Sequence, residues 1–384
     1  MSALNSSADP SAASLPALRP AASSRLLHLD GFKAVAAQLI VLHHLSAYGP
    51  VAEAVEELLP TLMAWAYQYG RMAVQVFLVL GGFLSARALS SRGQLLEGSL
   101  AGLIARRYQR LALPFMAAVL LTLACSALVA RWLPELVPAQ VGWGQLLAHA
   151  GLLQGVLGFE ALTVGAWYVA IDLQLFALLA GLLAFSRGLA LPRSWRRWIG
   201  PALVALLTAA SLLVFNRDAA LDNWGVYFFG AYGLGALVHW LGLLPQRRLG
   251  LMLLAALGLA ALLLDFRERI ALALATALLL AWLQRRHEAG VPALTPARLQ
   301  PLLAHLGTHS YALFLVHFPI LLLINALFER HELGDGWPGL MAMLAAWGLS
   351  NLAAVSFYRW IEAPAGRLRL GALLMRLWPR TLRA

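Results

Sequence analysis

The sequence predicts an all-α fold, a polytopic membrane bundle of about ten transmembrane helices with both termini in the cytoplasm. Hydrophobic residues make up 61% of the 384 residues and charged residues only 12%, whereas soluble domains average about 45–50% and about 25%. Stretches such as 251–264 and 270–283 contain no ionised side chain, as helices in lipid require. A polytopic membrane protein is therefore the class that fits this composition.

The formal net charge of +11 does not point to nucleic acid, because a helical bundle in lipid offers no continuous basic face. Basic residues at cytoplasmic helix ends explain the charge instead. The single cysteine, Cys125, lies in an apolar stretch, which excludes an internal disulfide and a thiolate metal cage. His305 and His309 have the spacing of a metal pair without an obvious third ligand, so we expect no metal.

The chain is expected to divide into three parts. Residues 1–25 are rich in Ser, Ala and Pro and are predicted to form a disordered N-terminal tail. A transmembrane domain follows over 26–365, and a basic cytoplasmic tail over 366–384. The apolar stretches that we expect to cross the membrane are, in order, 30–48, 70–90, 111–130, 166–186, 199–215, 224–244, 249–264, 270–284, 306–327 and 339–361.

Residues 144–158 are apolar but short and contain four glycines. The charges of the loops indicate whether this stretch crosses the membrane. If it does not, the cytoplasmic loops and termini hold 23 of the 29 Lys and Arg residues, and if it does, they hold only 12. Because Lys and Arg gather in cytoplasmic loops, we interpret 144–158 as an interfacial or re-entrant segment.

Two adjacent histidines, His43 and His44, lie within the first predicted span. His44 is roughly 16 Å along the helix axis from Lys33, close to the middle of the membrane. Neighbouring side chains point about 100° apart on a helix, so at most one of the pair is expected to face a given cavity. An imidazole at this depth is either hydrogen-bonded between helices or a general base, because a neutral imidazole accepts protons near neutral pH.

A basic cluster, Arg106, Arg107 and Arg110, precedes Pro114 at the predicted start of the third span. Anchoring on the cytoplasmic side explains these charges without any site. The alternative is a cradle for the phosphates of a nucleotide-bearing donor, since arginine forks suit phosphate groups. Arg106 and Arg110 are four residues apart and are expected to share one helix face.

Three further ionisable groups fall within predicted spans or at their ends, where charge is costly and often marks a site. His317 lies about half way through the ninth span, and Asp172 is the one acid well inside a span. Asp172 either lines a cavity from the outer side or pairs with an arginine. Glu362, at the inner end of the last span, is either a boundary charge or a site residue.

Five segments, in this order along the chain, resemble the motifs of the acyltransferase 3 family, whose members are polytopic membrane enzymes that O-acylate cell-surface carbohydrates. They are Leu29-Asp30-Gly31-Phe32-Lys33 with His44 eleven residues later, Phe77–Leu84, Arg106–Arg110 before Pro114, Ser310-Tyr311 with His317 and Pro319, and Glu362-Ala363-Pro364. Any one of these segments is a weak signal, but all five in order form a fairly specific one.

The resemblance extends from about residue 25 to residue 364, with departures at four positions. Lys33 stands where the family has arginine, which keeps the charge but loses the bidentate geometry. Ala73, Gln75 and Gly81 stand where the family commonly has a glycine, an acid and a serine. These departures bear on the subfamily and the acceptor more than on the class of reaction.

The resemblance implies an O-acyltransferase of a bacterial inner membrane. It would move an acyl group, expected to be acetyl, from acyl-CoA to a hydroxyl of a cell-surface or lipid-linked carbohydrate. Residues expected to hold the donor phosphates are Lys33, Arg106, Arg107 and Arg110. His44 is expected to act as general base or to form an acyl-histidine intermediate. Candidates for orienting groups are His317, Asp172 and Glu362, and Arg71 is a candidate for meeting the acceptor from outside.

Two other classes of function stay open at this point. A transporter of a lipid-linked saccharide or small amphiphile would explain ten helices and buried histidines as a substrate or proton path. It would not explain why a basic cluster accompanies a histidine in the first span. A non-catalytic scaffold of a glycan-assembly complex is the third possibility. The lipid bilayer, the acyl-CoA donor and the carbohydrate acceptor are the expected partners, and the sequence does not indicate an oligomeric state.

Overall fold

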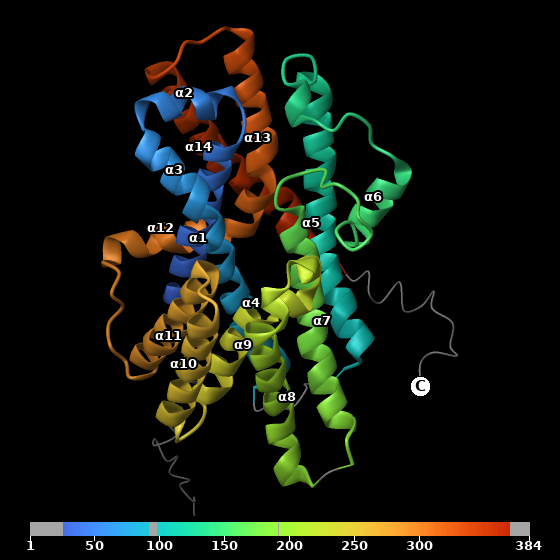
Figure 1. Ribbon diagram of the computed structural model, residues 1–384, viewed down its shortest axis with the longest axis vertical. Coiled ribbons are helices and arrows are strands. Elements are labelled where there is room, and N and C mark those ends of the chain that lie inside the picture. Colours follow the sequence, from blue (N-terminus) through green and yellow to red (C-terminus); the bar gives the residue numbers. More distant parts are fainter. Residues whose placement is uncertain (1–25, 92–97, 191, 369–384) are drawn as a thin grey trace, which may run out of the picture.

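The computed structural model describes residues 26–91, 98–190 and 192–368 (Figure 1). Within these ranges the chain forms helices and turns, without a β-strand. The predicted all-α class is therefore confirmed for this part of the chain. The predicted tail at 1–25 and most of the predicted tail at 366–384 lie outside the described residues.

The α-helices follow one another along the chain. They are α1 (Leu27–Ala47), α2 (Pro50–Leu58), α3 (Pro60–Tyr69), α4 (Val74–Leu89), α5 (Leu100–Val129), α6 (Trp143–Ala150), α7 (Ala166–Gly188), α8 (Arg193–Leu213), α9 (Gly225–Gly242), α10 (Arg247–Leu264), α11 (Glu268–Glu288), α12 (Gln300–Thr308), α13 (Ser310–Arg330), α14 (Trp337–Phe357) and α15 (Ala363–Ala365). In Figure 1, α5 runs along most of the long axis, with α13 and α14 toward one end and α7 and α8 toward the other.

Each of the ten predicted spans overlaps a helix. Seven helical segments of the described chain are long and apolar enough to cross a membrane, and the bent pair α1 and α2 would make an eighth. Helices α9 and α11 are not among them, since His239 and the polar end Gln284–His287 lower their hydropathy. The chain is thus a multi-pass membrane protein, while the number of ten spans and the cytoplasmic termini stay predictions.

Two helices begin earlier than predicted. The second span, predicted at 70–90, begins at Pro60, because α3 continues through one 3-10 turn into α4. The third span, predicted at 111–130, begins at Leu100, where the Ser99 hydroxyl accepts a hydrogen bond from the first turn at 3.1 Å and so caps the helix. The basic cluster therefore lies inside α5 and not before it.

Helix α6 is only eight residues long. A helix of that length reaches about 12 Å, far less than the roughly 30 Å of a hydrocarbon core. Its length agrees with the interpretation of 144–158 as a stretch that does not cross the membrane.

A sharp corner joins α1 to α2, which the sequence did not predict as a helix. The two helices meet at 96°, and Gly49 between them has φ +84°. A Cβ atom there would lie 2.4 Å from Oδ1 of Asn325, which accepts a hydrogen bond from the N–H of Val51 at 3.0 Å. The corner therefore needs glycine both for its backbone conformation and for space.

Helices α4 and α9 pack with their backbones in contact. A Cβ on Gly82 would lie 1.8 Å from the carbonyl oxygen of Tyr232, and one on Gly235 would lie 1.8 Å from that of Val79. Small residues allow such approach between membrane helices. The contact also brings the Tyr232 hydroxyl within 2.8 Å of Oγ of Ser85, to which it donates a hydrogen bond. Of these two helices, α4 lines the cavities described next.

Candidate functional site

A cavity of about 600 Å³ lies near the end of α1, between α1, α4, α7 and α13. We call it the outer cavity, because it lies on the side that the loop charges predict to be outside. Its polar and aromatic lining residues include His43, His44, Tyr48, Arg71, Ser126, Glu135, Gln145, Glu160, Thr163 and Trp167. This mixture of hydrogen-bonding and aromatic groups suits a molecule that carries hydroxyl groups.

His44 of α1 and His317 of α13 form a pair at the edge of this cavity. Nδ1 of His44 lies 2.8 Å from Nε2 of His317, and the ring planes are inclined by 19° with their centroids 4.8 Å apart. His317 is 2% exposed, so packing holds its ring in place. The structure thus joins two histidines that the sequence analysis had treated separately.

The hydrogen bonds of His317 determine which nitrogen carries each proton. Nδ1 of His317 lies 3.1 Å from the carbonyl oxygen of Leu313, and a carbonyl oxygen only accepts, so this nitrogen carries a hydrogen. In the neutral ring, Nε2 of His317 is then an acceptor, and Nδ1 of His44 donates to it. The remaining nitrogen of His44, Nε2, therefore has a free lone pair and is able to act as a base or nucleophile.

Both adjacent histidines line the outer cavity, so the expectation that at most one of them would face it is wrong. The cavity extends around α1 from the side of His317 to the side of Arg71 and thus covers more than the 100° between neighbouring side chains. His43 has its ring centroid 5.9 Å from that of Tyr67. Arg71 is exposed and forms no ion pair within the described residues.

Two further cavities, of about 890 Å³ and 480 Å³, lie toward the beginning of α5. The residues that line both of them are Gly81, Leu84, Arg107, Arg110 and Gly366. Because of this shared wall we treat them as one inner cavity with a larger and a smaller part. This cavity contains the four basic residues that the sequence analysis assigned to the donor.

Arg106 and Arg110 both line the larger part of the inner cavity, so the predicted common face is confirmed. Both side chains are exposed and form no ion pair within the described ranges. Lys33 lines the smaller part, with Nζ 3.9 Å from Oδ1 of Asp30. The inner cavity therefore presents cationic groups to any anion that enters it.

Arg107 differs from its two neighbours because its charge is compensated. Its Nη2 lies 2.7 Å and 2.6 Å from the two carboxylate oxygens of Asp172 on α7, and its guanidinium lies 5.4 Å from the ring centre of Phe176. Asp172 is 3% exposed and lines the inner cavity, not the outer one. Of the two alternatives for Asp172, the structure shows the one with an arginine partner.

Glu362 ends a π-helical turn, Tyr358–Glu362, that follows α14. Such turns are rare and occur frequently at functional sites. The Glu362 side chain lines the smaller part of the inner cavity together with Lys33. Its Oε2 is buried and has no hydrogen-bond partner in the described chain. A buried carboxylate oxygen without a partner is available to a donor group of a ligand.

Phe314 of α13 is the one residue of the described chain that lines both the outer and the inner cavity. Its ring lies edge-on to Tyr168 with centroids 5.4 Å apart, and Tyr168 lies 6.2 Å from Phe77. A Cβ on Gly165 would lie 2.4 Å from the tip of the Phe314 ring, so the ring is tightly enclosed. This aromatic layer separates the His44 and His317 pair from the basic cavity.

The sequence analysis did not single out Phe314, because phenylalanine is common in apolar helices. A second residue that the sequence analysis missed is His149 of α6. Its Nδ1 donates to the carbonyl oxygen of Gln145 at 2.8 Å, and its Nε2 accepts from the N–H of Leu162 at 3.0 Å. Burial lowers the pKa of His149, which favours the neutral ring that this pattern requires. His149 thus fixes the loop that lines the outer cavity.

Of the two histidines considered as a metal pair, His305 lies in the last turn of α12 and His309 lies directly before α13. The ring centroids of His305 and His309 are 4.3 Å apart, and the His309 ring meets Tyr358 edge-on. In the described ranges, no group of three or more His, Cys, Asp or Glu residues is placed to hold a metal ion. Neither ring lines the inner or the outer cavity.

Comparison with known protein families identifies the family of this chain. The model of the acyltransferase 3 family, described as an acyltransferase domain, matches residues 26–359. No match was found among curated proteins or among solved structures. The matched range includes the two histidines and the basic cluster, and Glu362 lies just beyond it. Since the match covers most of the chain, the protein belongs to the acyltransferase 3 family and is a membrane acyltransferase that transfers groups other than aminoacyl groups.

Proposed function

We propose that this acyltransferase moves an acetyl group from acetyl-CoA, bound from the cytoplasm, to a hydroxyl of a cell-surface or lipid-linked carbohydrate at a bacterial inner membrane. The observation that carries the proposal is the pair of cavities on either side of Phe314. One presents cationic side chains, and the other presents the free nitrogen of His44. A donor with phosphates and an acceptor with hydroxyls need these two kinds of site.

On the donor side, Arg106 and Arg110 would bind the phosphates of coenzyme A and Lys33 would assist them, since all three line the inner cavity. Arg107 would form a fixed wall of that cavity through its pair with Asp172. The thioester end of the donor would then lie toward Phe314. The acetyl group must pass this ring to reach His44, so the Phe314 side chain has to move during the reaction.

On the acceptor side, Nε2 of His44 would take the proton of the acceptor hydroxyl as its oxygen attacks the thioester carbonyl carbon. The carbon–sulfur bond then breaks, and the proton passes from His44 to the leaving thiolate. His317 acts as a positioning residue, because its hydrogen bond keeps the His44 proton on Nδ1. In a two-step route the same nitrogen attacks the thioester carbonyl carbon, the carbon–sulfur bond breaks and the thiolate leaves, and the acceptor oxygen then displaces the acetyl group from His44. Acetyl that remains on the protein in the absence of acceptor would identify that route.

Family membership favours an enzyme over a transporter or a scaffold, and a transfer assay tests the remaining parts of the proposal. Purified protein in vesicles is given radiolabelled acetyl-CoA and a crude glycan acceptor. We expect label to enter the glycan as an ester that mild alkali releases. Uptake of glycan into the vesicles without label transfer, or the absence of both, would contradict the proposed reaction.

Replacing Arg106 with glutamine is expected to raise the KM for acetyl-CoA about tenfold with little change in kcat. A contact with the donor phosphates stabilises the ground state and the transition state equally, and about 1.4 kcal/mol corresponds to a factor of ten. Acetyl-pantetheine has no phosphates, so its KM should stay the same. The control is Arg248→Gln, because Arg248 is an exposed residue of α10 that lines neither the outer nor the inner cavity. An equal rise in KM for both donors would exclude phosphate binding by Arg106.

Replacing Phe314 with leucine is expected to raise the hydrolysis of acetyl-CoA in the absence of acceptor. The smaller side chain opens the layer between the cavities, so water from the outer cavity reaches the thioester. Phe328→Leu makes the same change in a buried ring of α13 that lines neither cavity, and this variant should hydrolyse acetyl-CoA as slowly as the original protein. The measurement is the release of free thiol by variants with a monodisperse elution profile. Hydrolysis unchanged in the Phe314→Leu variant would show that Phe314 does not separate the donor from water.

A further inference from the structure

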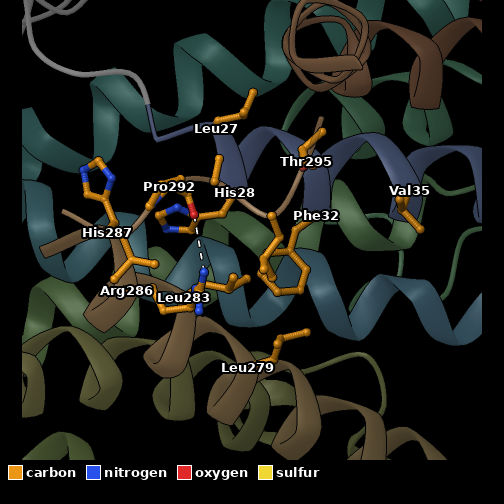
Figure 2. A pocket seen from close by; sticks show the side chains of 14 residues that line it. Leu27, His28, Phe32, Val35, Leu279, Leu283, Arg286, His287, Pro292 and Thr295 are labelled. Carbon is orange, nitrogen blue, oxygen red and sulfur yellow. Dashed lines mark hydrogen bonds between the residues drawn. The ribbon is translucent and has the colours of Figure 1, made fainter. Parts of the chain in front are cut away.

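A groove of about 410 Å³ lies between the first turns of α1, the last turns of α11 and the segment 291–295 (Figure 2). We call it the α1–α11 groove. It shares no lining residue with the outer or the inner cavity. The proposed acetyl transfer makes no use of it.

The α1–α11 groove is basic at one end and apolar at the other. Figure 2 shows Arg286 and His287 together at one end, while Phe32, Val35 and Leu279 lie toward the other. Val35 is 57% exposed and Leu279 44%, so protein packing leaves much of this apolar surface open. A ligand that matches both ends must itself have an anionic and an apolar part.

The basic end contains polar groups that the protein does not fully use. Nε2 of His28 is buried and has no hydrogen-bond partner in the described chain. Arg286 lies over the Trp282 ring, 5.0 Å from its centre, and donates one long bond of 3.4 Å to the carbonyl oxygen of Pro292. It forms no ion pair within the described residues. Buried polar atoms without partners are costly, which points to a ligand group at this end.

We propose that the α1–α11 groove binds an anionic phospholipid of the cytoplasmic leaflet. Its phosphate lies beside Arg286 and His287, and one acyl chain lies along Phe32, Val35 and Leu279. The loop charges predict that α1 begins and α11 ends on the cytoplasmic side, where basic pockets between transmembrane helices bind anionic head groups. A free phosphate has no part that matches the apolar end, and a zwitterionic lipid does not match the uncompensated charge of Arg286.

The groove and the inner cavity lie on different faces of the same turns of α1. Gly31 and Phe32 line the groove, whereas Asp30 and Lys33 line the inner cavity. A lipid in the groove would join the beginning of α1 to α11 and support the helix that carries Lys33. The inference concerns binding and does not depend on the acetyl donor or acceptor.

The test measures lipid binding to the delipidated full-length protein in detergent. Phosphatidylglycerol and phosphatidylcholine with identical acyl chains are titrated, and bound lipid is counted by native mass spectrometry. We expect phosphatidylglycerol to bind more tightly, and Arg286→Gln to weaken its binding about fivefold, since one basic residue contributes about 1 kcal/mol near a membrane surface. Leu279→Trp, which fills the apolar end, should weaken the binding of both lipids.

Two matched controls keep the result specific. Arg248→Gln removes an exposed charge of α10, and Leu263→Trp changes a leucine of the same helix that is 88% exposed. Neither Arg248 nor Leu263 lines the groove. Both variants should bind lipid like the original protein. Equal affinity for the two lipids, or displacement of phosphatidylglycerol by equimolar inorganic phosphate, would overturn the proposal. Binding that appears only after residues 1–20 are deleted would assign the groove to that segment and also overturn it.

Discussion

Replacing His44 with alanine is expected to lower the rate of acetyl transfer by about 10²–10⁴-fold, the usual contribution of a general base, while the protein stays folded and inserted. The reason is that Nε2 of His44 is the free nitrogen of the histidine pair, whereas both ring nitrogens of His317 are engaged. The measurement is the initial rate of label transfer by protein with a monodisperse elution profile. Transfer at the original rate would end the proposed role of His44.

Variants of His43 and His317 test whether the loss of activity is specific to His44 or follows the removal of any nearby imidazole. His43→Ala is expected to have a much smaller effect, because His43 makes no hydrogen bond to His317. His317→Leu should slow transfer about 10–100-fold, as loss of an orienting hydrogen bond does at metal-bound histidines. His317→Gln should retain more activity, since its amide oxygen is able to accept the proton of His44 Nδ1. Equal activity of the leucine and glutamine variants would argue against a positioning role.

Replacing Asp172 with asparagine is expected to lower the free energy of unfolding by about 3 kcal/mol. The substitution leaves the Arg107 charge without its partner, and breaking a buried ion pair costs about 3–5 kcal/mol. The lower end of this range applies because the Arg107 side chain keeps 26% of its surface exposed. Unfolding in a detergent titration, followed by tryptophan fluorescence, provides the measurement.

Removing both charges tests whether the lower stability of Asp172→Asn comes from the unpaired charge of Arg107. The double variant Arg107→Met with Asp172→Leu should be more stable than Asp172→Asn, because no buried charge remains. Glu288→Gln disrupts the exposed pair with Arg247 and should change stability by less than about 1 kcal/mol. A double variant as unstable as the single one would show that the ion pair is not the source of the loss.

These stability experiments also distinguish the arginines of the basic cluster. Arg107 is expected to affect folding through Asp172, whereas Arg106 is expected to affect only the KM of the donor. The sequence analysis assigned all three arginines of the cluster to the donor phosphates. The structure separates them because a carboxylate 65 residues further along the chain compensates only one of the three charges.

Much of the fold followed from local sequence patterns. Long apolar stretches predicted helices at ten places, and each is a helix in the structure. The i,i+4 spacing placed Arg106 and Arg110 on one face. Boundaries were less predictable, because a serine cap and a 3-10 turn, not hydropathy, determine where α5 and α4 begin. The corner at Gly49 was also missed, since it depends on Asn325 of a distant helix.

The sequence by itself determined that this chain is an all-helical membrane protein with a histidine in its first span and basic residues at one end. Composition and spacing suffice for that, because continuous apolar stretches span lipid as helices, and a polar side chain within such a helix is rare. Only the tertiary structure decided that His44 meets His317, 273 residues away, and that Phe314 separates this pair from the arginines. Such contacts arise from the packing of helices against one another, which no local pattern encodes.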